Sequence, residues 1–179
     1  MGEAMNLADF KRMAALAGIT GGGGGSTGNM RALAVSGAAA SVTGTLTKTA
    51  LATIAVPAGT LTANGRLEVF LDFEMTQNVN AKTLSLQFGG ADVAGTFGVN
   101  NSGNSFGAWL QYTIQNRNAL AAQATLMLAW DSPSNATFRA TDTRTINTAN
   151  AQNLVVFGQL GDVGDTITLR SYRVTLINP

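Results

Sequence analysis

The chain has 179 residues, which fits one domain plus an appendage. Its formal net charge is +1 and only 12% of its positions are charged, which suits a surface that contacts other proteins. Cysteine and histidine are absent, which excludes disulfide bridges, thiolate metal sites and nucleophiles activated by histidine. The basic residues are scattered and the apolar runs are short, so we expect neither nucleic-acid binding nor a membrane span.

The first predicted element is a short amphipathic helix over residues 5–17. Asn6 can cap its N-terminus, and Gly18 can end it. A helix of this length is only marginally stable alone in water. We therefore expect its apolar face to dock, either on the chain's own β body or, as the favoured alternative, on another protein. The predicted anchoring residues are Met5, Leu7, Phe10, Met13 and Leu16.

A glycine-rich segment follows this helix and predicts an extended tether. Residues 23–28 also match the letters of the dinucleotide-binding motif G-x-G-x-x-G. They follow a helix instead of a strand and lack the lysine of a phosphate-binding loop, so we predict no nucleotide and no other cofactor. We assign residues 1–35 to an N-terminal anchoring helix and arm, and residues 36–179 to the body. The tether consists of Gly21, Gly22, Gly23, Gly24 and Gly25.

The body has the two-residue period of β-strands. Residues 66–75 alternate most cleanly, and the Asn64-Gly65 pair before them is a tight-turn signal. In the last strand the apolar phase slips by one residue near Ser171, which predicts a bulge. Strands are predicted over residues 51–56, 66–75, 83–88, 106–114, 124–130, 137–144, 153–158 and 166–177.

This spacing of eight or nine short strands is typical of antiparallel all-β folds. A sandwich and a barrel both fit the pattern. We expect an all-β, jelly-roll-like β-sandwich that carries a short N-terminal helix and an extended glycine-rich arm.

Two pairs of acidic residues could carry chemistry. Asp72 and Glu74 share one strand face about 7 Å apart, within the separation of an inverting glycosidase pair. Acidic residues that alternate with apolar ones are also what an exposed sheet face contains, so we assign no catalytic residue and predict no enzyme. Asp162 and Asp165 could offer oxygens to a cation. Two carboxylates beside glycines more often form a hairpin turn, so we predict no metal.

Three amphipathic aromatic residues could form a ligand platform. Trp109, Trp130 and Tyr172 are, with Tyr112, the amphipathic aromatic residues of the predicted strands, where such rings can stack against a sugar or pack in the core or a subunit interface. We expect most of these rings in the core or a subunit interface, and contact with a carbohydrate or receptor is the less favoured alternative.

The first half of the body carries three segments that occur together in a known family. They are residues 45–61 (TLTKTALATIAVPAGTL), 64–69 (NGRLEV) and 82–90 (KTLSLQFGG). In this order they resemble the small jelly-roll structural proteins of tailed-bacteriophage virions, which are modules of heads and tails. The resemblance implies a non-catalytic, homotrimeric virion component with an N-terminal anchor and a distal β domain, and it supplies no catalytic residues.

We therefore expect a non-enzymatic structural protein of a phage virion. It would be a capsid decoration, head-fibre or tail component that assembles in the host cytoplasm and is anchored through its N-terminal arm to other capsid or tail proteins. The alternative is a receptor- or carbohydrate-binding module at the tip of a tail or fibre, with the tryptophans exposed.

Overall fold

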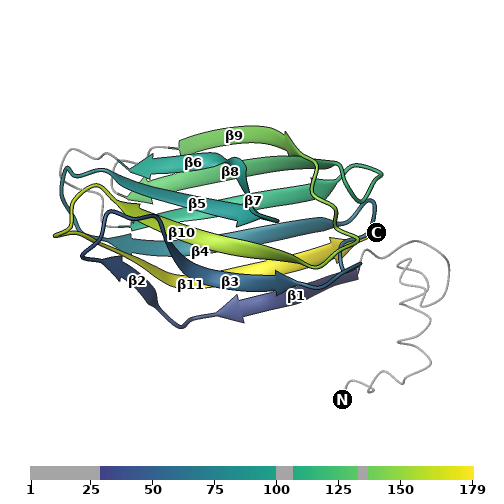
Figure 1. Ribbon diagram of the computed structural model, residues 1–179, viewed down its shortest axis with the longest axis horizontal. Coiled ribbons are helices and arrows are strands. Elements are labelled where there is room, and N and C mark those ends of the chain that lie inside the picture. Colours follow the sequence, from purple (N-terminus) through teal and green to yellow (C-terminus); the bar gives the residue numbers. More distant parts are fainter. Residues whose placement is uncertain (1–28, 100–106, 133–136) are drawn as a thin grey trace, which may run out of the picture.

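Two antiparallel β-sheets, packed face to face, make up the part of the chain that the computed structural model describes, which is residues 29–99, 107–132 and 137–179 (Figure 1). None of these residues belongs to a helix of the length and apolarity that a membrane span requires. The strands are β1 (Asn29–Ser36), β2 (Ala40–Thr43), β3 (Thr49–Val56), β4 (Arg66–Met75), β5 (Lys82–Phe88), β6 (Ala91–Val99), β7 (Gly107–Asn116), β8 (Gln123–Ser132), β9 (Thr137–Arg144), β10 (Gln152–Leu160) and β11 (Thr166–Asn178).

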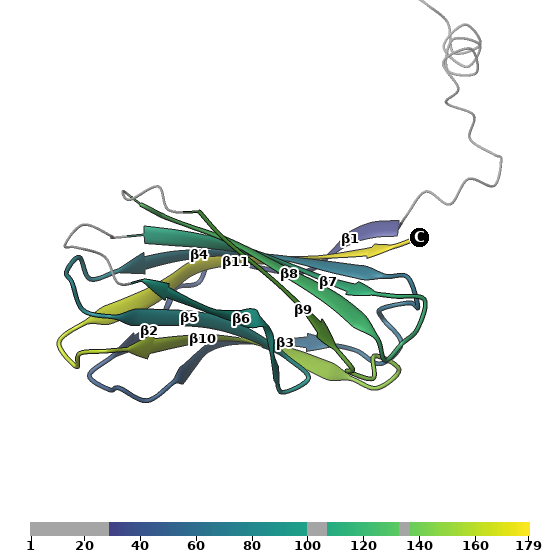
Figure 2. The ribbon, with the colours of Figure 1, turned by 90° about the horizontal axis from the view of Figure 1, so that it is seen from above.

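The strand order is that of a jelly roll. The larger sheet has the order β1-β11-β4-β7-β8-β9, with β2 also paired to β11, and the smaller sheet has the order β3-β10-β5-β6. From β2 to β5 the chain alternates between the two sheets, which form the two layers seen in Figure 2. The β8–β9 hairpin extends the larger sheet on one side and β1 extends it on the other. The predicted all-β, jelly-roll-like sandwich is confirmed.

The structure contains each predicted strand to within two residues, and the described residues form three more, β1, β2 and β6. Strand β6 was missed because Ala94 and Gly95 have positive φ angles of 54° and 84°, which interrupt the two-residue period. The predicted bulge is present, because the register between β11 and β4 shifts between Leu169 and Ser171. The predicted N-terminal helix and the glycine tether lie outside the described residues.

The core lies between the sheets and takes alternate residues from each strand. In β4, Leu67, Val69 and Leu71 are fully buried, whereas the residues between them are partly exposed. Because side chains alternate across an antiparallel strand, the larger sheet turns its second face to solvent. We call this second face the outer face, and it is available for a binding site.

Gly65 lies where the backbone approaches itself closely. Its N–H donates a hydrogen bond of 2.9 Å to the carbonyl of Thr62. A Cβ atom here would lie 2.8 Å from the Thr62 nitrogen and closer still to Oδ1 of Asn178. We expect Gly65→Ala to lower the free energy of unfolding by about 1–3 kcal/mol, as measured by urea denaturation.

The matched control is Gly37→Ala. A Cβ at Gly37 meets no described atom within 4 Å. Because alanine restricts the unfolded chain, Gly37→Ala should leave the free energy of unfolding unchanged or raise it slightly. Equal stability of the two variants would contradict the steric explanation.

Candidate functional site

Three partly exposed aromatic side chains form a row on the outer face of the larger sheet. Phe70 comes from β4, Trp109 from β7 and Trp130 from β8, which are neighbouring strands. The ring centroids of Phe70 and Trp109 are 6.1 Å apart, and those of Trp109 and Trp130 are 6.2 Å apart. The planes are tilted by only 22° and 21° within these pairs. We call these three residues the aromatic row.

The register of the strands brings the row together. Trp109 pairs directly with Trp130 of β8. On its other side Trp109 pairs with Asp72 of β4, and Phe70 comes two residues before Asp72, so Phe70 lies diagonally from Trp109. The residues before and after each ring in the sequence are buried; Ala108, beside Trp109, is one of them. Because side chains alternate along a strand, the three rings point to the outer face. A polar residue is the usual occupant of that face, so a contiguous aromatic group there is a sign of a binding surface.

Two hollows flank the aromatic row and bring polar groups to its rim. The first has a volume of about 320 Å³ and the second about 250 Å³. Rings beside a few converging polar side chains are the usual composition of a small-molecule site. The first hollow is lined by Asp72, Phe73, Glu74, Gly107, Ala108, Trp109, Trp130 and Arg170, and the second by Glu68, Val69, Phe70, Gln111, Arg173 and Thr175.

The charged groups at the rim are available to a ligand. The ion pair between Arg170 and Glu74 spans 3.4 Å, and both side chains are 60% exposed. Exposed pairs of this kind contribute little to stability, so a ligand can replace the contact without a large penalty. Within the described residues, neither Asp72 nor Arg173 belongs to an ion pair. The rim therefore offers both hydrogen-bond acceptors and donors.

The structure brings together two of the three predicted platform residues. Trp109 and Trp130 are in contact, but Tyr172 lies on the other face of the sheet, where it pairs with buried Leu71 and packs against the core. Sequence reasoning missed Phe70 as a platform residue. The signal in the sequence was an aromatic ring among the otherwise charged, outward-facing residues of β4.

Asp72 and Glu74, the two carboxylates considered as a glycosidase pair, both line the first hollow. A glycosidase general acid is usually shielded from water so that it keeps its proton. Glu74 is well exposed and paired with Arg170. This arrangement suits hydrogen bonding to a ligand better than proton transfer.

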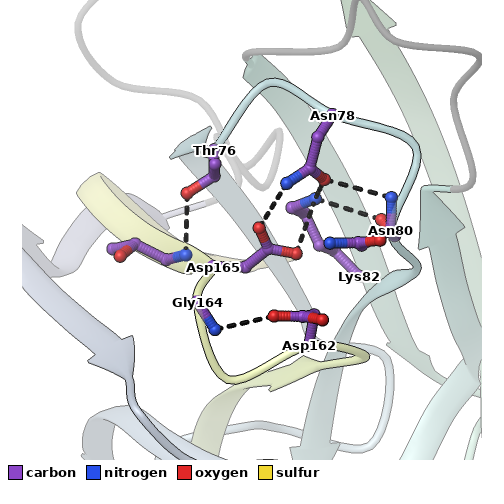
Figure 3. A network of polar contacts seen from close by, with 8 residues as sticks. Thr76, Asn78, Asn80, Lys82, Asp162, Gly164 and Asp165 are labelled. Atoms are coloured by element: carbon purple, nitrogen blue, oxygen red, sulfur yellow. Dashed lines mark hydrogen bonds and ion pairs between the residues drawn. The ribbon is translucent and has the colours of Figure 1, made fainter.

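Asp162 and Asp165, considered as cation ligands, have separate structural contacts (Figure 3). Asp162 accepts a hydrogen bond of 2.8 Å from the N–H of Gly164 and so closes the turn before β11. Asp165 is almost fully buried and forms an ion pair of 3.3 Å with buried Lys82. The residues that the structure describes contain no group of three or more acidic, histidine or cysteine side chains that could hold a metal.

The Lys82 ammonium lies among oxygens from the loop between β4 and β5 and from Asp165 (Figure 3). It donates to Oδ1 of Asn78 at 2.7 Å and to the carbonyl of Asn80 at 3.0 Å. Burial alone would raise the pKa of Asp165. The hydrogen bonds from Asn78, Lys82 and Asn80 and the charge of Lys82 outweigh burial and hold this pKa below its ordinary value.

The start of β1 and the two tryptophans lie toward opposite ends of the sandwich. Asn29, the first described residue, pairs with Asn178, so β1 begins beside the C-terminal end of β11 (Figure 1). At this end β4 begins with Arg66. Trp109 pairs with Asp72, six residues further along β4, which is about 20 Å away. The tryptophans therefore lie toward the end remote from the start of β1.

Comparison with protein-family models and with curated proteins gives no match for this sequence. Similar solved structures include the CBM2 module of the evolved Dit of Lactobacillus casei BL23 phage J-1, with 10% identity, a TM-score of 0.39, and coverage of 71% of this chain and 69% of that chain. The C-terminal domain of the sugar-binding protein EclA has 10% identity, a TM-score of 0.37, and coverage of 78% and 74%. A Lotus tetragonolobus seed lectin has 10% identity, a TM-score of 0.41, and coverage of 86% and 94%. These likenesses are distant and carry no argument about function.

Proposed function

We propose that this chain is a non-catalytic carbohydrate-binding module whose glycan lies across Phe70, Trp109 and Trp130. The aromatic row carries this proposal, because it presents near-parallel, partly exposed rings between two hollows. The C–H face of a sugar ring is apolar and packs well on an aromatic ring. The sugar hydroxyls then find partners at the rim, with Asp72 as an acceptor and Arg173 as a donor.

The resemblance of the first half of the body to phage virion proteins supports a place for this module on a virion. Asn29, the first described residue, lies at one end of the sandwich, and the tryptophans lie toward the other. An anchor at the first end would leave the aromatic row free to contact a glycan on a cell surface. A capsid-decoration role needs no aromatic row on a solvent face, so the receptor-binding alternative accounts for the site better.

Tryptophan fluorescence provides a direct test, because the chain has only two tryptophans and both lie in the aromatic row. We expect a glycan array probed with the full chain to identify a ligand, and titration with that ligand to shift the tryptophan emission in a saturable way. Calorimetry should give the same dissociation constant. Binding without any change in emission would place the ligand elsewhere, and failure to bind any glycan would contradict the proposal.

A further inference from the structure

Strand β1 is the most open strand of the larger sheet. It pairs with β11 on one side, and among the described strands its other edge has no partner. It packs substantially on no described strand except β11. Five of its eight residues are exposed, whereas Leu33 and Ala34 pack partly against the core. Met30 and Val35 are 67% and 68% exposed, more than any other large apolar side chain in the described residues except Val79. In Figure 1, β1 lies at the border of the molecule.

The free edge of β1 is poorly protected against pairing with another strand. It is eight residues long, contains no proline and carries a single charge, on Arg31. Strand β9, at the opposite edge of the same sheet, carries three charges, on Arg139, Asp142 and Arg144. Charges on an edge strand discourage pairing with another chain. The two edges are therefore unequal, and β1 is the one suited to association.

The sequence of β1 is complementary to itself in one antiparallel register. When Met30 faces Val35 of a second copy, the two-fold axis also places Val35 of the first copy opposite Met30 of the second. Arg31 then faces Ala34 instead of the arginine of the second copy, so the like charges are kept apart. The most exposed apolar side chains of the strand thus meet each other twice.

The bulge in β1 makes this register possible. In a regular strand, residues five apart point to opposite faces of the sheet and cannot be paired across a two-fold axis. The register of β1 on β11 shifts between Ala32 and Ala34. Met30 consequently pairs with Ile177 and Val35 with Arg173, both on the outer face. Met30 and Val35 can therefore meet on one face.

We propose that two copies of this chain associate through antiparallel pairing of their β1 strands about a two-fold axis. The two larger sheets then form one continuous sheet, and the two aromatic rows face the same side of it. This proposal stands on β1 alone and does not depend on what the aromatic row binds. A two-fold edge contact also differs from the homotrimer that the sequence resemblance implies.

Engineered cysteines test the register, because the chain has no cysteine of its own. In full-length Met30→Cys/Val35→Cys, the thiol at position 30 of one copy faces the thiol at position 35 of the other. The Cα atoms of such paired residues are about 4.5–5.5 Å apart, a separation that a disulfide can bridge. The two positions in one chain lie about 15 Å apart and cannot bridge. Mild oxidation should convert most of the protein to a covalent dimer on a non-reducing gel.

The single variants supply the matched controls. Met30→Cys alone and Val35→Cys alone should remain uncrosslinked, and an equal mixture of the two should recover the covalent dimer. Light scattering of the unmodified chain should give twice the chain mass. Met30→Lys/Val35→Lys, which places like charges opposite each other, should raise the dissociation constant roughly tenfold or more.

Three results would overturn the proposal. A monomeric mass would show that β1 has no second copy as its partner and is left open or covered by the chain's own residues 1–28. A trimeric mass would favour the three-fold assembly implied by the sequence resemblance. Efficient crosslinking of either single variant would mean that the register is wrong.

Discussion

Replacement of Trp109 by alanine is expected to weaken glycan binding by about 10- to 100-fold. Trp109 is the central ring of the aromatic row, in contact with both Phe70 and Trp130, and it lines the first hollow. Its loss removes one of the two indole rings available to a sugar ring and leaves the outer rings without a shared neighbour. The affinity of Trp109→Ala for the glycan found on the array can be measured by calorimetry.

The matched control is Phe138→Ala. Phe138 is a 45% exposed ring on β9, next to β8, but it packs near Phe97 on the side facing the smaller sheet. Its removal should leave the glycan affinity within about twofold of the unmodified value, because the ring is not part of the row. Circular dichroism verifies that both variants fold. An equal loss of affinity in both variants, or none in Trp109→Ala, would contradict a role for the aromatic row.

Lys82→Met should lower the free energy of unfolding by about 3–5 kcal/mol, because it leaves a buried carboxylate without its counter-charge. The side chains of Lys82 and Asp165 are each only 2% exposed, so water cannot take over the lost contact. Asn78 and the carbonyl of Asn80 lose a donor at the same time. Urea denaturation measures the loss, and Lys82→Met/Asp165→Leu should recover part of it because the unpaired charge is gone.

The pH dependence of the stability lost in Lys82→Met gives a second measurement of the ion pair between Lys82 and Asp165. The pKa of Asp165 is held below its ordinary value, so the contact stabilises the fold above the unfolded pKa of about 3.9. This stabilisation fades as the pH falls through the lower pKa of the folded state. In Lys82→Met, burial without the counter-charge should raise the pKa of Asp165. The difference in stability between the unmodified chain and Lys82→Met should therefore shrink as the pH falls through this raised pKa, and level off below the lowered pKa of the unmodified fold. A difference that stays constant down to pH 2 would mean that Asp165 is not the affected group.

The parts of the fold that local sequence determines were the predictable ones. The clean alternation of residues 66–75 gave β4, and the phase slip near Ser171 gave the bulge in β11. Strand β6 could not be predicted, because the backbone at Ala94 leaves the strand conformation in the middle of the strand. All of strand β1 except Ser36 was assigned to the arm, and its pairing depends on β11, at the far end of the sequence.

The candidate site was only partly predictable, for a similar reason. Trp109 and Trp130 are visible in the sequence as amphipathic rings, but their contact requires the register of β7 on β8. Phe70 enters the row only because β4 lies beside β7. Lys82 and Asp165 lie 83 positions apart and meet only when the sandwich closes. Interactions between distant segments leave no local pattern in a single sequence.

The buried Lys82 has a consequence for the conditions under which this corner of the sandwich keeps its shape. The positive charge that gathers the oxygens of Asn78, Asn80 and Asp165 belongs to a side chain, so it is covalently attached to the fold. A chelator cannot extract it, and dilution cannot make it dissociate. The turn before β11 and the loop after β4 should thus hold the same arrangement in calcium-rich and calcium-poor surroundings alike.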